Sequence, residues 1–392
     1  MTKKSAAPAI RFKGFTDAWE QRKFEEIAVR SSVICSDDTL PRVEYEDIVS
    51  GTGRLNKDIY AKQSIKSGIA FHQGDVLYGK LRPYLQNWLL PTFDGLAVGD
   101  FWVLQPQNAD SSFLYRLIQS RQFDEVANQS TGTKMPRADW KLVSKTVFSI
   151  PSNISEQAAI GTYFTALDSL ITLHQREYDK LTNVKKSMLE KMFPKNGSNY
   201  PEIRFKGFTD AWEQRKAKEL FVSTADKGYP ELPVLSATQD RGMIRRDENS
   251  INIFHDKKNE AGYKRVLPGQ FVIHLRSFQG GFAHSAIEGI TSPAYTVFGF
   301  SEPEKHDSEY WKYVFTSKSF IRRLETVTYG IRDGRSISYD EFLTLGFVYP
   351  SKAEQTAIAR YLDKLSDLIT LHQREYDKLT NVKKSMLEKM FV

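Results

Sequence analysis

Two long segments of this chain each occur twice without a single change. Residues 10–23 (IRFKGFTDAWEQRK) return as residues 203–216, and residues 170–193 (LITLHQREYDKLTNVKKSMLEKMF) return as residues 368–391. An internal repeat on this scale constrains the fold more than any local propensity, because each copy must form the same structural unit.

The interiors between these repeated segments are different. Residues 24–149 and 217–348 share only faint similarities, such as GDVL at 74–77 and GQFV at 269–272. Packing alone tolerates wide drift, so identity beside divergence indicates a constant frame that carries two exchangeable modules. A recent duplication followed by uneven drift is the alternative.

We expect four parts, at residues 1–155, 156–194, 195–353 and 354–392. The first and third are modules with their leading repeated segment, and the second and fourth are long helices. A Pro-x4-Glu-Gln-like motif marks each boundary; it comprises Pro151, Glu156, Gln157 and Ile160, matched by Pro350, Glu354, Gln355 and Ile358.

The repeated tails have the heptad pattern of a coiled coil, with side chains in alternating steps of four and three. Two such helices in one chain can bury their seams against each other, and an antiparallel pair would place the modules at opposite ends. His174 and His372 are expected to set the register, and Lys185 and Lys383 to extend to solvent near the ends. The other expected seam residues are Phe164, Leu167, Ile171, Tyr178, Leu181, Met188 and Met192, and Leu362, Leu365, Ile369, Tyr376, Leu379, Met386 and Met390.

Each variable module has the pattern of a compact α+β domain, with short strand-like runs between turns. Phe12, Phe15 and Trp19, with Phe205, Phe208 and Trp212 in the second copy, are predicted to anchor module to frame. Strands are predicted at 76–78, 101–104, 147–150, 271–275 and 347–349, and short helices at 112–120 and 308–315.

Two pairs of loops at matched positions contain the residue types that recognise base edges. Arginine and lysine suit guanine, and glutamine and asparagine suit adenine, whereas solvated surface loops are the alternative. The candidate DNA contacts are Lys80, Arg82, Tyr84, Gln86, Asn87, Lys134 and Arg137 in the first module, and Arg276, Ser277, Gln279, Arg332, Arg335 and Ser336 in the second.

Composition sets wider limits. The net charge of +7, from 55 basic and 48 acidic residues, permits nucleic-acid binding without requiring it. A single cysteine, Cys35, excludes an internal disulfide and fits a reducing cytoplasm. The N-terminal residues lack the apolar core of a secretory signal, and no run of about 18 apolar residues suggests a membrane span.

Motifs of catalysis are missing from the sequence. Gly74-x4-Gly79-Lys80 is similar to a phosphate-binding loop, but Leu81 stands where Ser or Thr would hold magnesium, and Pro83 follows. The seven histidines have no metal-binding spacing, and no Gly-x-Ser-x-Gly elbow occurs. We therefore expect no catalytic site, no metal and no cofactor on this chain.

The frame resembles the specificity subunits of type I restriction–modification systems. The resemblance rests on the F-x-G-F-x-x-x-W-E start at 12–20, the boundary motif at 151–160 and the two-fold repetition of both. It implies two target-recognition domains in a pseudo-two-fold arrangement, each recognising half of a bipartite double-stranded DNA site.

The resemblance also implies partners. Methyltransferase subunits, two in number, would carry S-adenosylmethionine and modify adenine, and restriction (motor-nuclease) subunits would carry ATP and magnesium. Charged outer faces with Arg176, Glu177, Lys180 and Lys186 would dock them. The alternatives are a non-catalytic coiled-coil adaptor that binds only proteins and a self-contained modification enzyme.

Overall fold

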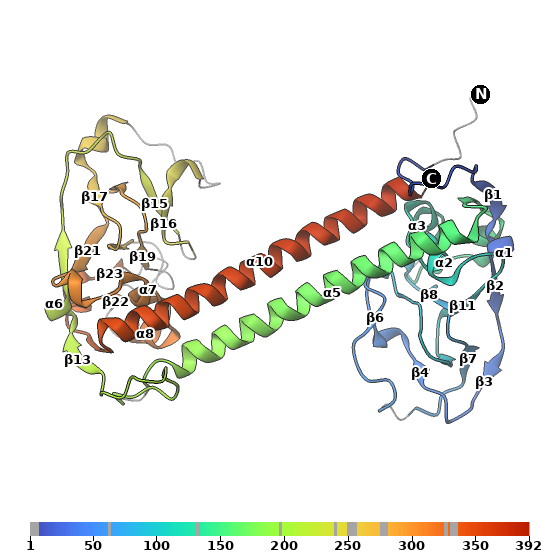
Figure 1. Ribbon diagram of the computed structural model, residues 1–392, viewed down its shortest axis with the longest axis horizontal. Coiled ribbons are helices and arrows are strands. Elements are labelled where there is room, and N and C mark those ends of the chain that lie inside the picture. The colour runs from blue at the N-terminus through green and yellow to red at the C-terminus, as the bar shows by residue number, and fades with distance from the viewer. Residues whose placement is uncertain are drawn as a thin grey trace. The chain divides into compact units, whose positions relative to one another are not determined.

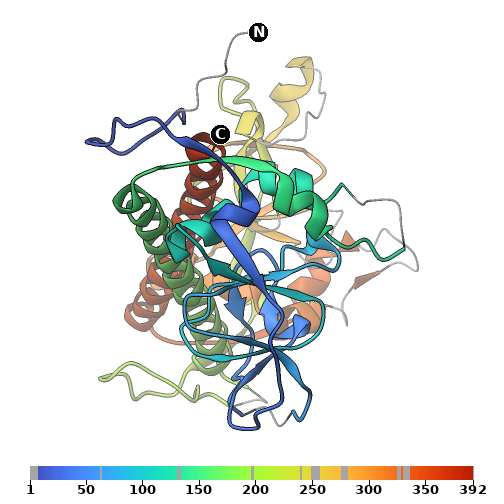
Figure 2. The ribbon, with the colours of Figure 1, turned by 90° about the vertical axis from the view of Figure 1, so that its right-hand side faces the viewer.

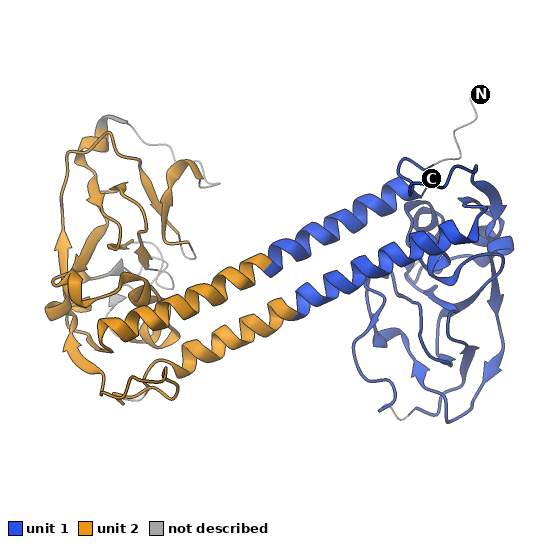
Figure 3. Cartoon of the chain, in the orientation of Figure 1, with its two compact units in different colours: residues 1–176, 372–392 blue, residues 177–371 orange. Residues whose placement is uncertain are grey.

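The structure is a computed structural model that describes residues 8–61, 64–129, 134–195, 198–238, 241–248, 257–274, 281–324, 328–329 and 336–391. The chain forms two compact units, shown in different colours in Figure 3. Unit 1 contains residues 1–176 and 372–392, and unit 2 contains residues 177–371. Each unit therefore holds one variable module and a part of both long helices, α5 (Ile154–Lys191) and α10 (Lys352–Met390).

The module of unit 1 is a mixed domain of short strands and helices (Figures 1 and 2). Its helices are α1 (Phe24–Ile27), α2 (Ser111–Leu117), α3 (Arg121–Ala127) and α4 (Trp140–Lys145), with 3-10 turns η1 (Tyr45–Asp47) and η2 (Pro83–Leu85). Its strands are β1 (Glu20–Lys23), β2 (Ala28–Ser31), β3 (Ile34–Cys35), β4 (Arg42–Val43), β5 (Ile48–Val49), β6 (Arg54–Leu55), β7 (Gly68–Phe71), β8 (Val76–Gly79), β9 (Trp88–Leu89), β10 (Gly95–Ala97), β11 (Phe101–Pro106) and β12 (Val147–Ile150).

Unit 2 contains the second module. Its helices are α6 (Ala217–Leu220), α7 (Ser308–Thr316), α8 (Lys318–Leu324) and α9 (Tyr339–Phe342), with 3-10 turns η3 (Arg246–Glu248), η4 (Lys257–Gly262) and η6 (Pro303–Lys305). Its strands are β13 (Glu213–Lys216), β14 (Phe221–Thr224), β15 (Leu235–Ala237), β16 (Met243–Arg245), β17 (Lys264–Val266), β18 (Phe271–Ile273), β19 (Phe282–His284), β20 (Gly289–Thr291), β21 (Thr296–Phe300), β22 (Thr328–Tyr329), β23 (Ser336–Ile337) and β24 (Gly346–Tyr349).

The two modules share a four-stranded sheet although their sequences differ. Its order is β2-β11-β8-β9 in unit 1 and β14-β21-β18-β19 in unit 2, with antiparallel neighbours. The predicted strands β8, β11, β12, β18 and β24 are confirmed, although β18 ends at Ile273, before the predicted end at residue 275, which lies outside the described part. Unit 1 adds a second sheet, β3-β7-β10-β4, whereas unit 2 has the pairs β15-β16 and β17-β20 at the corresponding stage of the chain.

The leading repeated segments share a strand pairing and an ion pair in both units. The letters EQRK form β1 in one copy and β13 in the other, which pair with β12 and β24. Glu156, at the start of α5, is buried and accepts two hydrogen bonds from Arg11, at 2.6 and 2.7 Å; Glu354 binds Arg204 in the same way at 2.8 and 2.7 Å. The boundary motif is therefore a lock between the leading segment and the helix.

The adjacent glutamine completes this lock. Gln157 accepts a hydrogen bond from the backbone N–H of Asp110 at 2.9 Å and donates to the carbonyl of Pro151 at 2.8 Å. Gln355 makes the equivalent pair with Asp307 and Pro350. Because both polar ends of these buried amides are satisfied, the motif joins strand, short helix and long helix without leaving an unpaired group.

Each unit buries one aromatic anchor of the leading segment. Trp19 and Trp212 are 4% and 2% exposed, as predicted. Phe12 and Phe205 pack against the rings of Tyr163 and Tyr361 at 5.6 and 5.7 Å. Phe15 and Phe208 are only half-buried and belong to neither core, so their predicted role as core anchors is wrong.

The far end of each long helix enters the core of the other module. In unit 1, Met390 at the end of α10 is 2% exposed, and Phe391 stacks on Phe113 at 5.5 Å. In unit 2, Met192, beyond the end of α5, is 2% exposed, and Phe193 stacks on Tyr310 at 5.6 Å. Each core is thus completed by a helix whose first residues belong to the other unit.

Two predicted helices differ at their ends. The helix predicted at 112–120 ends at Leu117, because Ser120 instead caps α3 by accepting a hydrogen bond from the backbone N–H of Phe123. The helix predicted at 308–315 is confirmed as α7, which Asp307 caps. The long helices begin at Ile154 and Lys352, while the four expected part boundaries remain a prediction.

Candidate nucleic-acid interface

The loop of residues 80–87 follows β8 in unit 1 and has an unusual backbone. Arg82 and Gln86 have φ angles of 48° and 55°, and they are two of three described non-glycine residues with positive φ. Between them η2 is closed by backbone hydrogen bonds, including Leu85 N–H to the Arg82 carbonyl at 2.8 Å. Left-handed backbone at arginine or glutamine costs energy and persists only where neighbours impose it, which is common in binding sites.

Neighbouring segments hold this loop from two sides. The hydroxyl groups of Tyr45 and Ser50 donate to the carbonyls of Leu81 and Leu85. The N–H of Arg82 donates to the carbonyl of Pro136 at 2.7 Å. Burial raises the pKa of Tyr45 to about 12, so its hydroxyl remains a donor at neutral pH. The loop conformation is therefore set by tertiary contacts.

The second candidate loop, residues 134–138, lies against the first. The N–H of Ala138 donates to the carbonyl of Lys80 at 2.8 Å. Asp100 then holds two of the predicted cations: Arg137 at 3.1 Å and Lys80 at 3.6 Å. Burial would raise the pKa of Asp100, but the hydrogen bond and charge of Arg137, with Lys80, lower it. These two cations are thus partly neutralised before any ligand arrives.

The remaining candidates of unit 1 divide into exposed and inward-facing side chains. Arg82 and Lys134 are exposed and make no ion pair with the described residues, and Tyr84 is 55% exposed. Gln86 is half-buried. Asn87 is only 6% exposed, which argues against the base contact predicted for it, because its amide faces the protein interior.

The candidates of unit 2 fall outside what can be described. Arg276, Ser277, Gln279, Arg332 and Arg335 lie outside the described residues. Ser336 opens the short strand β23, and its side chain is likewise outside the described part. For these six residues, DNA contact remains a prediction.

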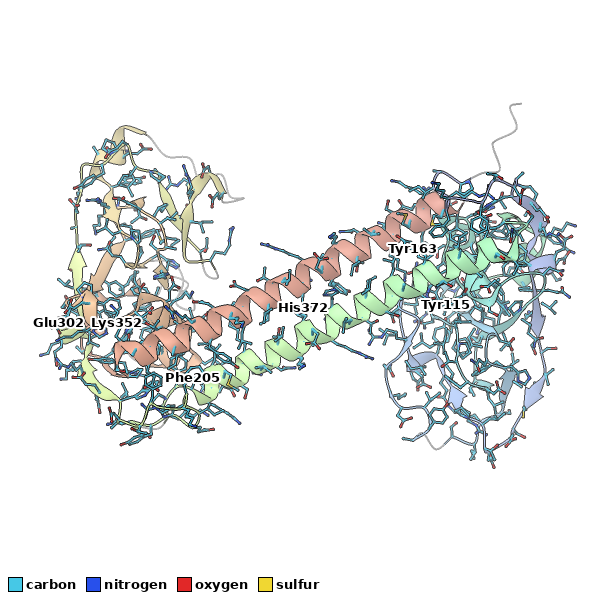
Figure 4. All side chains as sticks on the ribbon, in the orientation of Figure 1. Tyr115, Tyr163, Phe205, Glu302, Lys352 and His372 are labelled. Atoms are coloured by element: carbon cyan, nitrogen blue, oxygen red, sulfur yellow. The ribbon has the colours of Figure 1, made fainter. Side chains whose placement is uncertain are left out.

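The helices pack in antiparallel fashion within each unit. In unit 1, His174 lies opposite His372 with 3.0 Å between their Nδ1 atoms, and Asp168 lies opposite Lys383 (Figure 4 labels His372). The predicted seam residues are buried or half-buried; they are Leu167, Ile171, Tyr178, Leu181, Met188, Leu365, Ile369, Tyr376, Leu379 and Met386.

The expectation for the two seam lysines is wrong. Lys383 does not extend to solvent but binds Asp168 at 2.7 Å, with its side chain 16% exposed. Lys185 donates to the hydroxyl of Ser366 at 2.7 Å, and burial, with the nearby charge of Lys312, lowers its pKa. The same repeated lysine therefore meets an acid in unit 1 and a hydroxyl in unit 2.

Sequence reasoning missed the residues that shape the loops. Tyr45, Ser50 and Asp100 carry no motif, and their roles depend on contacts between segments 30 or more residues apart. The described residues hold no cluster of three or more metal-ligating side chains. Within the described part of the chain, no helix has the length and apolar character needed to cross a membrane.

Comparison with known proteins gives a consistent result. Residues 31–183 match the family model described as a type I restriction modification DNA specificity domain. The chain is 24% identical over 333 residues to the MjaVIII type I restriction enzyme specificity subunit of Methanocaldococcus jannaschii, covering 77% of each chain. It is 25% identical over 185 residues to the EcoDI specificity subunit of Escherichia coli, covering 45% of this chain and 41% of that one.

The fold has a solved counterpart. The crystal structure of a type I restriction-modification system S subunit from M. genitalium superposes with a TM-score of 0.61 at 12% identity, covering 98% of this chain and 99% of that one. At this identity the likeness concerns the fold alone, and it agrees with a two-module α+β architecture that contains long paired helices.

Proposed function

We propose that this chain, which is similar to the specificity subunits of type I restriction–modification systems, is such a subunit and that each of its variable modules recognises one half of a bipartite DNA site. The observation that carries this proposal is the combination of the same four-stranded sheet in both units with different sequences between its strands. A constant scaffold that presents variable loops suits a protein whose target changes while its assembly does not.

In the loops of unit 1, different side chains suit base contacts and phosphate contacts. Arg82 is exposed, yet its backbone is fixed by Pro136 and by η2, which suits a directed contact with a base edge. Lys134 is exposed and makes no ion pair with the described residues, which suits a phosphate contact that sets register. Tyr84 offers an exposed ring beside them.

The paired helices would then set the unread gap and dock the catalytic partners. α5 has 38 residues, about 57 Å of helix at ~1.5 Å per residue. Two methyltransferase subunits would bind the charged outer faces around Arg176, Glu177, Lys180 and Lys186, and restriction subunits would join them. S-adenosylmethionine, ATP and magnesium would belong to those partners, which must rotate the target adenine out of the stack to modify it.

Exchange of one module tests the proposal. Residues 24–149 are replaced by the corresponding interior of a relative, and the methylated motif of the host genome is sequenced. One half of the motif should change and the other half should stay. A change in both halves would contradict independent recognition, and loss of methylation with an intact fold would contradict exchangeability.

The spacing role has its own test. Four residues inserted after His174 and four after His372 lengthen both opposed helices by about 6 Å. At ~3.4 Å per base pair the unread gap should grow by one to two base pairs. An unchanged gap in an active variant would mean that the helices do not set it.

The protein-binding adaptor makes a different prediction for salt. A DNA-binding protein loses affinity steeply as salt rises, because bound phosphates release counterions. A chain that binds only proteins through an apolar interface would show no such dependence, and no methylated motif would change with its modules.

A further inference from the structure

A short turn next to the candidate loops is not among the DNA contacts predicted from the sequence. Residues 50–53 (SGTG) connect β5 to β6, and Gly51 and Gly53 both have positive φ, at 70° and 66°. The hydroxyl of Thr52 donates to the carbonyl of Val49 at 2.8 Å, which closes the turn. Ser50, Gly51 and Thr52 are all exposed.

This turn is attached directly to the loop of residues 80–87. The hydroxyl of Ser50 donates to the carbonyl of Leu85, and the N–H of Gly51 donates to the carbonyl of Gln86 at 3.1 Å. Because the same loop also bonds to Pro136, the three segments 50–53, 80–87 and 134–138 are joined edge to edge.

The turn also rests on the scaffold. A side chain at Gly53 would collide with the hydroxyl of Tyr115 on α2, so only glycine fits there (Figure 4 labels Tyr115). The next residue of α2, Arg116, binds Asp168 of α5 at 2.7 Å, and Asp168 also binds Lys383 of α10. One layer of side chains therefore fixes the turn relative to the helices of unit 1.

Some of the positively charged side chains around this surface are paired with acidic residues, and others are not paired with any described acidic residue. Lys57 is paired with Asp47, and Lys80 and Arg137 are paired with Asp100. Arg54, the first residue of β6, is exposed and makes no ion pair with the described residues. Together with Arg82 and Lys134, Arg54 provides one cation without an ion pair among the described residues on each of the three joined segments.

We propose that the turn of residues 50–53 and Arg54 form a third DNA-contacting element of unit 1, in which Arg54 binds a backbone phosphate. This inference rests on the proposed function, but the proposed function does not require this contact. A phosphate is the fitting partner because the exposed Arg54 side chain makes no ion pair with the described residues that would orient it toward a base edge, and a point of positive charge suffices for phosphate. The exposed glycine of the turn lets the DNA backbone approach closely.

Binding measured against salt tests this assignment. The full chain, purified with the methyltransferase subunits it assembles with, is bound to duplexes selected from a randomised library over a range of KCl concentrations. Arg54→Gln is compared with Arg22→Gln, a control that removes one charge at an arginine already paired with Glu20 at 2.6 Å, and with Arg82→Gln. Thermal unfolding checks that each variant is folded.

Arg54→Gln should reduce the slope of log affinity against log salt by about 0.9 and weaken binding about fivefold at ~0.15 M salt, with the selected motif unchanged. Arg22→Gln should change neither quantity. An Arg54→Gln slope equal to that of the wild type overturns the inference, as does a relaxed base preference with an unchanged slope. If the wild type selects no motif at all, the proposed function has failed instead, so the two failures are distinguishable.

Discussion

Units 1 and 2 bury the same repeated side chains in equivalent places, yet each joins its module to the helices through different charged groups. In unit 1, Arg116 and Lys383 both bind Asp168. In unit 2, Asp363 takes this role from a position about one turn earlier in the long helix, before the repeated tail begins, and it binds Lys312 at 3.0 Å and Tyr313 at 2.6 Å.

The residues that make these charged contacts different lie immediately before the repeated tail of each long helix. Position 168 corresponds to Ser366, and Asp363 corresponds to Thr165, whereas Lys383 and Lys185 are the same repeated residue. The repeated tail is therefore identical in both units, and the residues that it contacts differ between them. This suggests that modules remain exchangeable only if the residues just before the tail change with them.

The largest effect should follow from breaking the repeated lock. Glu156→Gln leaves the Arg11 guanidinium without its carboxylate, and the free energy of unfolding of unit 1 should fall by about 3–5 kcal/mol. Glu354→Gln should do the same to unit 2 through Arg204. Hydrogen exchange, measured peptide by peptide against urea, assigns the loss to a unit.

A matched control is the double change Arg11→Met with Glu156→Leu, which removes both charges and should recover most of the stability. If Glu156→Gln costs less than about 1 kcal/mol, or loosens both units equally, the lock does not act locally.

A smaller effect tests the exchange of helix ends. Met192 lies beyond the end of α5, whose first residues belong to unit 1, yet it is buried in unit 2. Met192→Ala should therefore destabilise unit 2 by about 2–3 kcal/mol, and Met390→Ala should destabilise unit 1. The same peptide-resolved exchange would disprove this if each change weakened the unit in which its helix begins.

The two lysines sharpen the comparison further. Lys383→Met removes one of two cations bound to Asp168 and should cost unit 1 about 1 kcal/mol. Lys185→Met should cost unit 2 less, because burial already disfavours the charge of Lys185 and its hydrogen bond goes to a hydroxyl and not to a carboxylate. In chemical denaturation, Ser366→Asp should make the loss of Lys185 costly; equal losses before and after that change would refute the explanation.

The smallest expected effect is a loss of stability of unit 2 at acidic pH. Burial lowers the pKa of His284 and His306 in unit 2, so their folded pKa lies below the unfolded value of about 6.5. The stability that their neutral form allows is present above that value and is lost as pH falls below it. Exchange of β18 and β21 peptides, corrected for intrinsic rates, should accelerate below pH ~6 more than that of β8 and β11.

His306→Ala gives unit 2 the residue that precedes the α2 cap in unit 1, Ala109, and should remove part of this difference. Equal acid sensitivity of the two units would contradict the assignment.

Much of the architecture follows from local pattern. The heptad steps, the strand runs and the boundary motif depend on residues near one another in sequence, so the long helices and the strands β8, β11 and β18 could be predicted. The Glu-Gln pair was recognisable as a boundary, but its role as a lock with Arg11 depends on residues 145 positions apart.

The candidate interface divides in the same way. Residue type and position alone made Arg82 and Lys134 candidates, because an arginine or lysine in a loop can be read directly from the sequence. It could not distinguish them from Lys80 and Arg137, which Asp100 holds, or from Asn87, which is buried. The exposure and the ion pairing of a side chain depend on which residues surround it in the folded protein. No repeating pattern in the sequence reports either of them.

The sequence by itself thus determined that there are two modules, two long helices and one repeated frame. Only the tertiary structure decided which end of each helix completes which core, and which cations remain uncommitted. The physical reason is that identical segments such as 170–193 and 368–391 carry identical propensities. Their partners, Asp168 for one lysine and Ser366 for the other, come from residues that the repeat does not contain.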